Sequence, residues 1–432
     1  MNILIVYERK NREFENSCLL KVELESRGHN CDVFQFYQLE GLNAISKHSY
    51  DVIFVPHLYN ESEVYRTISR FGKSTRIINL QYEQVLSEKW EKLGHHTPSG
   101  LATQFEHICW GPKTSDRLLK AGVPAKNIHE VGAIQLDLLR EEYRQSGLVK
   151  DSLGGAFHLD SNKKWNLFLS SFTYAEIDQH RLRMNENVAG ASLENFVEIH
   201  TDSRTEILKW LEMAVCHFPD EIFIYRPHPD ELNLKSVEDL SKRYSNFVII
   251  CELSAKLWIE SADMILSWYS TTLVESHFLG KEYAILRPYP LPGDFDSVLL
   301  KKGKFIRDSN ELINAMLSGD IGFALDEKDV GDYYSHLNVP AFKSLASIVE
   351  SKFNNQTLLF KIPIIYKFKS VLVACFLLIH SHVSKSPFKS VFNKLKFYRR
   401  WAEEIEAQSY SYDELKRTCD DIKVRISDKS SY

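Results

Sequence analysis

The sequence lacks the cysteine patterns of a disulfide-stabilised or zinc-binding protein. Its 7 cysteines are dispersed over 432 residues, and no two stand at the spacing of a zinc or redox motif. A scattered, odd-numbered set is typical of reduced thiols in a cytosol. The opening segment Met1–Tyr7 also lacks the basic lead and the long apolar run of a signal peptide. We therefore predict a first β-strand there and a cytoplasmic protein.

Motifs of several common enzyme classes are absent as well. No G-x-G-x-x-G follows the first expected strand, which argues against a dinucleotide cofactor, and there is no Walker loop or G-x-S-x-G elbow. The pairs His95-His96 and His380-Ser-His382 have no third ligand at a sensible spacing, so we expect neither a metal nor a cofactor. No nucleic-acid-binding module is recognisable, and the acidic body of the chain opposes nucleic-acid binding.

Acidic residues are missing from one long stretch. From Ser351 to Trp401 we count ten Lys or Arg and no Asp or Glu, although the formal net charge is −5, so the rest of the chain is near −15. Within this stretch Ile362–His380 is strongly apolar, and Phe388–Trp401 mixes cations with aromatic residues, as membrane-surface segments do. Its apolar run Val371–Ile379 is about half the roughly 20 residues of a membrane span. The alternative is a helix packed on the body with a solvated basic face.

The chain does contain a regular alternation of short apolar runs and longer amphipathic stretches. In the first part the strand-like runs are Ile3–Tyr7, Cys31–Phe36, Asp51–Val55, Arg76–Leu80, His107–Trp110 and Ile128–Val131. After a polar segment the pattern restarts, with strands at Trp165–Leu169, Glu221–Tyr225, Phe247–Ile250, Met264–Ser267 and Tyr283–Leu286. Helical patterns lie between these runs, among them Phe14–Arg27, Glu61–Phe71, Lys113–Ala121, Arg204–Cys216, Leu234–Tyr244, Leu253–Ser261, Thr272–Leu279 and Asn310–Leu317.

This alternation predicts parallel sheets with helices on both faces, and 432 residues are too many for one core. We predict an α/β protein with two doubly wound, Rossmann-like domains, residues 1–150 and 160–330, that face a cleft. A helical, basic region follows at residues 331–432. In such sheets ligands bind at the carboxyl ends of the strands, so polar residues that directly follow a strand are candidate site residues.

The stretch from Ile222 to Glu231 is the most informative of these strand ends. Four apolar or aromatic residues run into Arg226, His228, Asp230 and Glu231, which are separated by two prolines. A cation, an imidazole and two carboxylates thus follow one strand on backbone that proline stiffens. A salt-bridged turn is the alternative to a functional site.

A second candidate site follows the expected strand Met264–Ser267. Hydroxyls at a helix start suit a phosphate, and a carboxylate one turn later suits ribose hydroxyls. The alternative is an ordinary capping box, with a Ser or Thr cap and Glu275 three residues later. The strand Trp165–Leu169 also ends in hydroxyls and in Glu176, which we expect in the same cleft. The predicted donor-binding set is Arg226, Ser170, Ser171, Ser267, Ser270, Thr271, Thr272 and Glu275.

In the first domain Gln81-Tyr-Glu-Gln84 follows a strand and is predicted to point polar groups at the cleft. Gln81 and Glu83 are the candidate acceptor-binding residues, with a surface loop as the alternative. Asp294-Phe-Asp296 matches a D-x-D metal-nucleotide motif, but its Pro/Gly-rich loop indicates a chance match.

Three segments together resemble bacterial surface-carbohydrate biosynthesis proteins of GT-B fold. They are Arg226-Pro-His-Pro-Asp230, Ser267–Glu275 and Gly111-Pro-Lys…Gly122-Val-Pro…Val131-Gly-Ala-Ile-Gln-Leu-Asp137. Within this group the chain resembles the retaining β-Kdo transferases of capsule and lipopolysaccharide O-antigen synthesis, which take 3-deoxy-D-manno-oct-2-ulosonic acid (Kdo) from CMP-Kdo. The resemblance covers about residues 1–330, and similar segments occur in polysialyltransferase-like and glycerophosphotransferase-like relatives.

The resemblance implies that the second domain binds a CMP-sugar donor, the first binds a glycan or lipid-linked glycan acceptor, and no metal takes part. It also implies double displacement through a carboxylate nucleophile, and the matching residue is Asp230. His228 and Arg226 would hold the sugar carboxylate or the phosphate, with Glu176 as acid/base. Two successive inversions at one carbon give retention, which agrees with a carboxylate at this position.

Other functions fit the same sequence features. A sialyl- or glycerophosphotransferase of capsule synthesis would carry similar motifs. A sugar-nucleotide epimerase also uses two such domains, although a soluble metabolite enzyme has no need of the basic tail. A non-catalytic scaffold for polysaccharide assembly is disfavoured by the presence of both Asp230 and Glu275. With its basic tail, a transferase is expected to be peripheral at the inner face of the plasma membrane, with an anionic membrane surface as partner.

Overall fold

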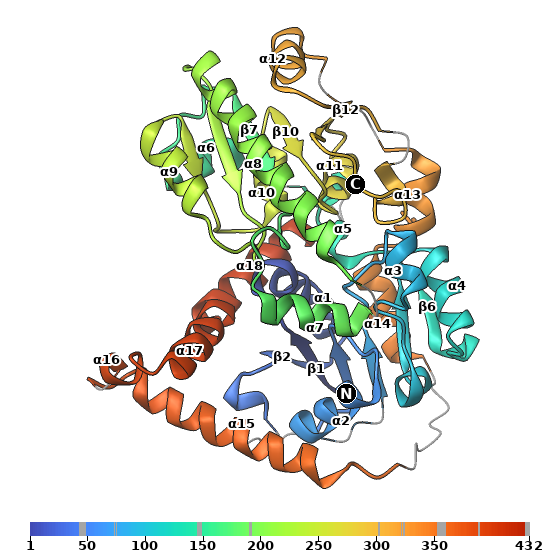
Figure 1. Ribbon diagram of the computed structural model, residues 1–432. Helices are drawn as coiled ribbons and strands as arrows, with labels where there is room; N and C mark the ends of the chain where they lie inside the picture. The colour runs from blue at the N-terminus through green and yellow to red at the C-terminus, as the bar shows by residue number, and fades with distance from the viewer. Residues whose placement is uncertain are drawn as a thin grey trace. The chain divides into compact units, whose positions relative to one another are not determined.

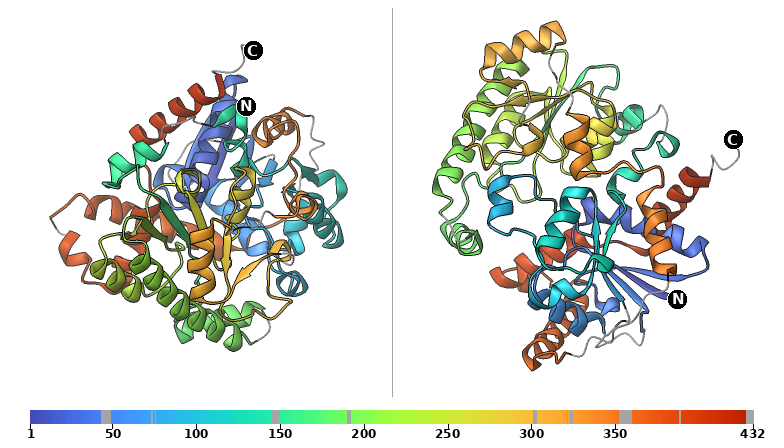
Figure 2. Two further views of the ribbon diagram at one scale, coloured as in Figure 1. Left: turned by 90° about the horizontal axis from the view of Figure 1, so that it is seen from above. Right: turned by 90° about the vertical axis from the view of Figure 1, so that its right-hand side faces the viewer.

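The protein is described from a computed structural model, drawn in Figures 1 and 2. The structure describes residues 1–42, 49–72, 74, 76–144, 149–189, 192–300, 303–320, 322, 325–351, 360–387 and 389–427. The chain forms two compact units, and each contains one six-stranded sheet. Unit 1 is Met1–Gln84, His96–Leu138 and Gly331–Tyr432, and unit 2 is Val85–His95 and Leu139–Val330.

The sheet of unit 1 is parallel and has the strand order β2-β1-β3-β4-β5-β6. Its central strands are buried on both faces, because they are runs of Ile, Leu, Val and Phe. The order reverses between β1 and β3, which makes their carboxyl ends the topological switch point. The strands are β1 (Asn2–Tyr7), β2 (Asn30–Gln35), β3 (Val52–Val55), β4 (Arg76–Asn79), β5 (Glu106–Cys109) and β6 (Ile128–Glu130).

Helices from both ends of the chain belong to unit 1, and α1 lies beside both α14 and α18. The amphipathic α2 begins at the cap residue Asn60, whose side chain accepts a hydrogen bond from the Glu63 amide. The helices of this unit are α1 (Glu15–Ser26), α2 (Glu61–Phe71), α4 (Pro112–Lys120), α5 (Ile134–Asp137), α14 (Ala341–Glu350), α15 (Ile364–Val383), α16 (Lys389–Phe392), α17 (Lys396–Gln408) and α18 (Tyr412–Ser427).

The glycine-rich run that contributes to the family resemblance has a structural task in unit 1. A Cβ at Gly111 would lie 2.6 Å from the backbone of Tyr333, so only glycine permits this close approach. Gly132 has a φ of 82° and packs against the Ser335 carbonyl. The buried Asp137 carboxylate accepts hydrogen bonds from the first amides of α14, Ala341 and Phe342, at 3.0 and 2.8 Å. The run therefore anchors the segment that returns to unit 1.

The sheet of unit 2 is also parallel, with the order β12-β11-β10-β7-β8-β9. This is the doubly wound order in which the first strand of the unit, β7, lies beside the fourth, β10. The strands are β7 (Trp165–Leu169), β8 (Ile222–Arg226), β9 (Phe247–Ile249), β10 (Met264–Ser267), β11 (Ala284–Leu286) and β12 (Phe305–Ile306). The switch point of this sheet lies at the carboxyl ends of β7 and β10.

The longest helix of unit 2, α8, begins ten residues before the predicted Arg204 start. Phe196, His200 and Ser203 continue its buried face toward the amino end, and no proline or glycine interrupts it. The helices are α3 (Glu88–Lys92), α6 (Val149–Phe157), α7 (Gln179–Ala189), α8 (Glu194–His217), α9 (Lys235–Arg243), α10 (Ala255–Ser261), α11 (Leu273–Phe278) and α12 (Ser309–Ser318), and α13 (Glu327–Tyr333) leads back to unit 1.

All eleven strands predicted from apolar runs are present, each within one residue at either end. The twelfth, β12, has only two residues and therefore no recognisable pattern. The predicted α/β class with two parallel sheets is confirmed.

Candidate functional site

The carboxyl ends of β7 and β10 are tied together at the switch point of unit 2. Ser267 Oγ donates a hydrogen bond to the Leu169 carbonyl at 3.0 Å, and the Tyr269 amide donates to Ser171 Oγ at 3.1 Å. Two of the segments predicted to bind a donor therefore meet, as the sheet order requires. Ser267 is fully buried and holds the strand ends, whereas Ser270 and Thr272 are half-buried and Thr271 is exposed.

Glu231, one of the two carboxylates after β8, is buried and anchors the loop. Its side chain has no exposed surface, and it accepts hydrogen bonds from Ser170 Oγ at 2.5 Å and from the Tyr225 hydroxyl at 2.7 Å. Arg204 Nε lies 3.0 Å from Glu231 Oε1. Burial raises the pKa of Glu231 above its ordinary value, although these donors favour the charged form. Glu231 and Ser170 thus position the loop.

Asp230 and His228 lie on the turn that Glu231 anchors. The His228 amide donates to Glu231 Oε2 at 3.3 Å, and the Asp230 amide donates to His228 Nδ1 at 3.0 Å. Because Nδ1 accepts, the neutral imidazole carries its proton on Nε2. The Asp230 side chain is 38% exposed, and its Oδ1 lies 3.9 Å from Arg181 Nη2 of α7. Of the two neighbouring carboxylates, one is buried and the other reaches solvent.

Arg226, predicted to contact the donor, holds the next loop of unit 2. Its guanidinium donates to the carbonyls of Glu252, at 2.8 Å, and Leu253. Burial lowers the pKa of Arg226 to about 10, so it stays charged at neutral pH. Its contact with a donor remains a prediction.

Glu275 does not form the capping box that was the alternative to a ligand site. The N-cap residue of α11, Thr272, makes no side-chain cap hydrogen bond. Ser270 Oγ lies 2.6 Å from Thr272 Oγ1 and accepts from the Thr272 amide instead. The Glu275 carboxyl is buried, and its Oε2 has no hydrogen-bond partner within the described part of the chain. Burial raises its pKa to about 7.

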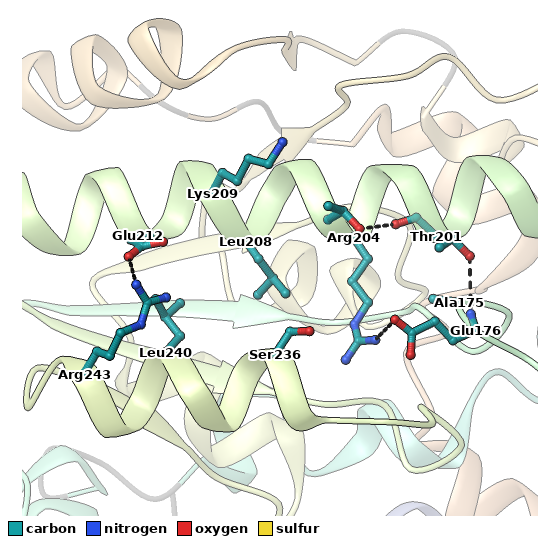
Figure 3. Close-up of a pocket in the computed structure, with 11 residues that line it drawn as sticks. Ala175, Glu176, Thr201, Arg204, Leu208, Lys209, Glu212, Ser236, Leu240 and Arg243 are labelled. Carbon is teal, nitrogen blue, oxygen red and sulfur yellow. Dashed lines mark hydrogen bonds and ion pairs between the residues drawn. The ribbon is translucent and has the colours of Figure 1, made fainter.

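Glu176, the predicted acid/base, is held by Asn233 and Arg204. It hydrogen-bonds the Asn233 amide group, and its Oε1 is 4.0 Å from Arg204 Nη1. Figure 3 shows it at one end of a pocket between α8 and α9, with Lys209, Glu212 and Arg243 toward the other end. This pocket of about 170 Å³ lies between helices and not at the strand ends. The catalytic role of Glu176 therefore remains a prediction.

The residues after β7 and β10 rest on an aromatic floor. Phe172 stacks on Trp268 with ring centroids 4.7 Å apart, and His200 of α8 meets the Trp268 ring edge-on at 4.5 Å. Burial lowers the pKa of His200 to about 3, so the ring is neutral. Neither ring nitrogen of His200 has a hydrogen-bond partner among the described residues. The aromatic packing thus supports the strand ends in addition to the hydrogen bonds of Ser267 and Ser171.

A cluster of charged residues occupies the switch point of unit 1. Glu8 follows β1, and its Oε2 lies 3.2 Å from His57 Nε2, which follows β3. Glu63 Oε2 of α2 lies 3.5 Å from His57 Nδ1. Burial alone would lower the pKa of His57, but the two carboxylates outweigh it and raise this pKa to about 9. The hydrogen bond to His57 lowers the pKa of Glu8 to about 2.

The predicted acceptor residues differ in exposure. Gln81 is fully buried at a φ of 56°, and its side chain bonds Asn79, so contact with an acceptor would require its release. The Glu83 side chain is 35% exposed and pairs with Arg12 Nη1 at 2.5 Å. Burial alone would raise the pKa of Glu83, but the charge of Arg12 outweighs it and lowers this pKa. Acceptor binding by either residue remains a prediction.

Several site residues were missed because they come from helices or lone positions. Arg204 and Arg181 have no motif around them, and Glu8, His57 and Glu63 converge only through the sheet order. The signal that could have found Glu8 and His57 is their place one and two residues after strands that flank a switch point. Asp296 of the D-x-D match pairs with Arg287 at 2.6 Å. No group of three or more His, Cys, Asp or Glu suited to a metal occurs among the described residues.

Comparisons with known proteins support the fold. No family model matches the chain, and no curated protein matches it. The wall teichoic acid polymerase TagF aligns with a TM-score of 0.50 at 10% identity, over 81% of this chain and 88% of TagF. The UDP-GlcNAc 2-epimerase of Methanocaldococcus jannaschii aligns at 0.49 and 11% identity, over 81% and 99%. S. aureus MnaA with UDP aligns at 0.47 and 11%, over 81% and 96%.

At 10 to 11% sequence identity these alignments show a similar fold and no more. The chain has a two-domain α/β fold of the GT-B type, with two parallel six-stranded sheets and additional C-terminal helices. The predicted fold class is therefore confirmed.

Proposed function

We propose that the protein is a metal-independent glycosyltransferase that uses a nucleotide-sugar donor for surface-polysaccharide synthesis. The observation that carries this is the switch point of unit 2. There Ser171 Oγ accepts a hydrogen bond from the Tyr269 amide, next to Ser270, and β10 leads to the buried carboxyl of Glu275, whose Oε2 has no hydrogen-bond partner among the described residues. Hydroxyls suit a phosphate, and a buried carboxyl suits ribose hydroxyls.

The chemistry is assigned to the turn after β8. Asp230 is the solvent-accessible carboxylate, and the buried Glu231 holds its backbone in place. In the proposed reaction an Asp230 oxygen bonds to the anomeric carbon while CMP leaves with the electrons of the broken C–O bond. An acceptor hydroxyl then attacks the same carbon and passes its proton to solvent water, while Asp230 leaves as a carboxylate with the electrons of its bond to the sugar. In this proposal the guanidinium of Arg181, which lies beside Asp230, binds the carboxylate of an acidic sugar such as Kdo.

The acceptor is assigned to the charged cluster of unit 1. Carboxylates are good acceptors for sugar hydroxyls, and Glu8 and Glu83 are both partly exposed. His57 remains protonated at neutral pH, because two carboxylates face it. It supplies a positive charge next to Glu8 and fixes the orientation of that carboxylate.

The test is a panel of donors, with and without glycan acceptors. We expect CMP release with CMP-Kdo, and no loss of binding after EDTA. After an acid quench without acceptor, mass spectrometry should show one added Kdo on the peptide that contains Asp230. Asp230→Asn should abolish transfer while donor binding survives, because the lost interaction belongs to the transition state.

Asp220 provides a matched control for Asp230. It is an exposed carboxylate just before the amino end of β8, the strand that leads to Asp230. Asp220→Asn should leave transfer unchanged. Turnover of CDP-glycerol or CMP-sialate in place of CMP-Kdo would redirect the donor assignment to the alternative transferases. Epimerisation of a UDP-sugar without transfer of the sugar to an acceptor would refute the assignment as a transferase. Near-normal turnover by Asp230→Asn would refute the nucleophile.

A further inference from the structure

The helix α15 attaches to unit 1 by one face only. On this face Ser370, Ala374 and Leu377 are buried. Ser370 Oγ donates a hydrogen bond to the Ser69 carbonyl of α2 at 2.9 Å, and Ala374 and Leu377 pack with Leu42. Figure 1 shows α15 alongside α2, at the outside of the unit. Its inner face is thus an ordinary packed interface.

The opposite face of α15 is apolar and exposed along the whole helix. Ile364 is 84% exposed, Phe368 58% and Ile379 52%. At about 100° and 1.5 Å per residue these positions form one stripe roughly 23 Å long. The same stripe includes Ile365, Val371, Leu372 and Leu378, and after α15 the chain exposes Val391, Leu395 and Phe397. Exposed apolar patches of this extent mark an interaction surface.

Cations accompany this apolar stripe. By helical position, Lys367 and Lys369 fall on its two flanks, where long side chains keep their ammonium groups in water above an apolar surface. Exposed Lys385, Lys394 and Arg400 follow in the segments after α15. No Asp or Glu occurs between Ser351 and Trp401. The combination of apolar face and basic flanks complements the anionic surface of a lipid bilayer.

Two other occupants fit this surface less well. Within the described residues, α15 alone is long and apolar enough to cross a membrane, with a mean hydropathy of 1.6. Crossing would break the contacts of Ser370 and Leu377 with unit 1 and bury two lysines in hydrocarbon. A second copy of the chain would bring the same positive flanks against each other, and like charges at an interface are unfavourable.

We propose that the exposed face of α15 docks on an anionic lipid surface while the inner face stays packed on unit 1. The helix lies in the plane of the membrane interface, and the flanking lysines contact lipid phosphates. Membrane docking does not rest on the transferase assignment, because it involves a different surface and is tested by a binding assay without donor.

The experiment is co-sedimentation of the full chain with vesicles of phosphatidylcholine alone or with added phosphatidylglycerol. We expect binding only with phosphatidylglycerol, weakened by salt. Lys367→Gln with Lys369→Gln should weaken binding roughly 25-fold, at about 5-fold per cation. Phe368→Gln with Leu372→Gln should reduce it at least as much, because both side chains belong to the exposed stripe.

Matched controls exist on other exposed surfaces. Leu317 of α12 is 63% exposed and Lys126 is exposed, so Leu317→Gln and Lys126→Gln should bind as the parent chain does. Circular dichroism and melting temperatures should show that every variant is folded. Three results would overturn the proposal: equal binding to phosphatidylcholine alone, retention in alkali-washed membranes as a spanning protein, or no vesicle binding together with a dimer that Phe368→Gln dissociates.

Discussion

Replacing Glu275 by Gln should stabilise the protein above neutral pH and weaken its binding of nucleotide. The carboxyl is buried, its Oε2 has no hydrogen-bond partner in the described chain, and burial raises its pKa from 4.5 to about 7. An unfolded chain ionises Glu275 at its ordinary pKa. The folded chain must therefore either keep the proton or bury a charge, and both are unfavourable as the pH rises.

The magnitude follows from the two pKa values. Below about pH 4.5 both states are protonated, and Glu275 has no effect on the free energy of unfolding. The loss of stability grows as the pH rises and is complete just above pH 7, where it amounts to about 3 kcal/mol. Glu275→Gln removes the titrating group and keeps the shape. Its advantage over the parent chain should be near zero at pH 4.5 and about 3 kcal/mol at pH 8.

Urea unfolding at these two pH values, followed by tryptophan fluorescence, measures this difference. Glu311→Gln is the control, because Glu311 lies in the first turn of α12 but is exposed. CMP titrations of the same variants should show weaker binding only for Glu275→Gln. Equal stability differences at both pH values would refute the burial argument. Unchanged CMP affinity would refute the role of Glu275 at the ligand site.

Two predictions concern unit 1. The folded pKa of His57 is about 9 against an ordinary 6.5, so its stabilising pair with Glu8 and Glu63 is complete below pH 6.5 and lost as pH rises through 9. His57→Gln should therefore flatten the decline of unfolding free energy between pH 6.5 and 9.5, and an unchanged slope in urea titrations would contradict this. Asp137→Asn should lower the unfolding free energy by about 2 kcal/mol, because the buried carboxylate accepts from two amides of α14. The exposed Asp116 of α4 is the control, and equal effects of the two Asp→Asn changes would show that the cap contributes nothing.

The fold was predictable because each strand is an apolar run bounded by polar residues. Buried parallel strands such as Val52–Val55 have no alternating pattern to misread, so their limits were found within one residue. The early start of α8 was missed because His200 and Ser203 are polar residues buried on an apolar face. A sequence pattern gives no reason to expect them there.

The candidate site was predictable where it lies on single segments and not where it depends on packing. The turn after β8 was found, but its division into a buried Glu231 and an exposed Asp230 depends on Arg204 from α8 and on Tyr225. The pairing of His57 with Glu8 joins residues 49 positions apart. Only the strand order, which no local pattern reveals, makes them neighbours.

Both units place carboxylates beyond the strands where their sheet order reverses, Glu8 directly after β1 and Glu275 in α11 after β10, but in opposite states. Beyond β10, Glu275 Oε2 has no hydrogen-bond partner in the described chain, and burial favours the neutral form of the carboxyl. Beyond β1, Glu8 faces His57 and is held ionised. The buried carboxyl of Glu275 is not needed for the fold, because an apolar residue at position 275 would satisfy the core better. Departures from the most stable choice at strand ends are the expected mark of a functional site.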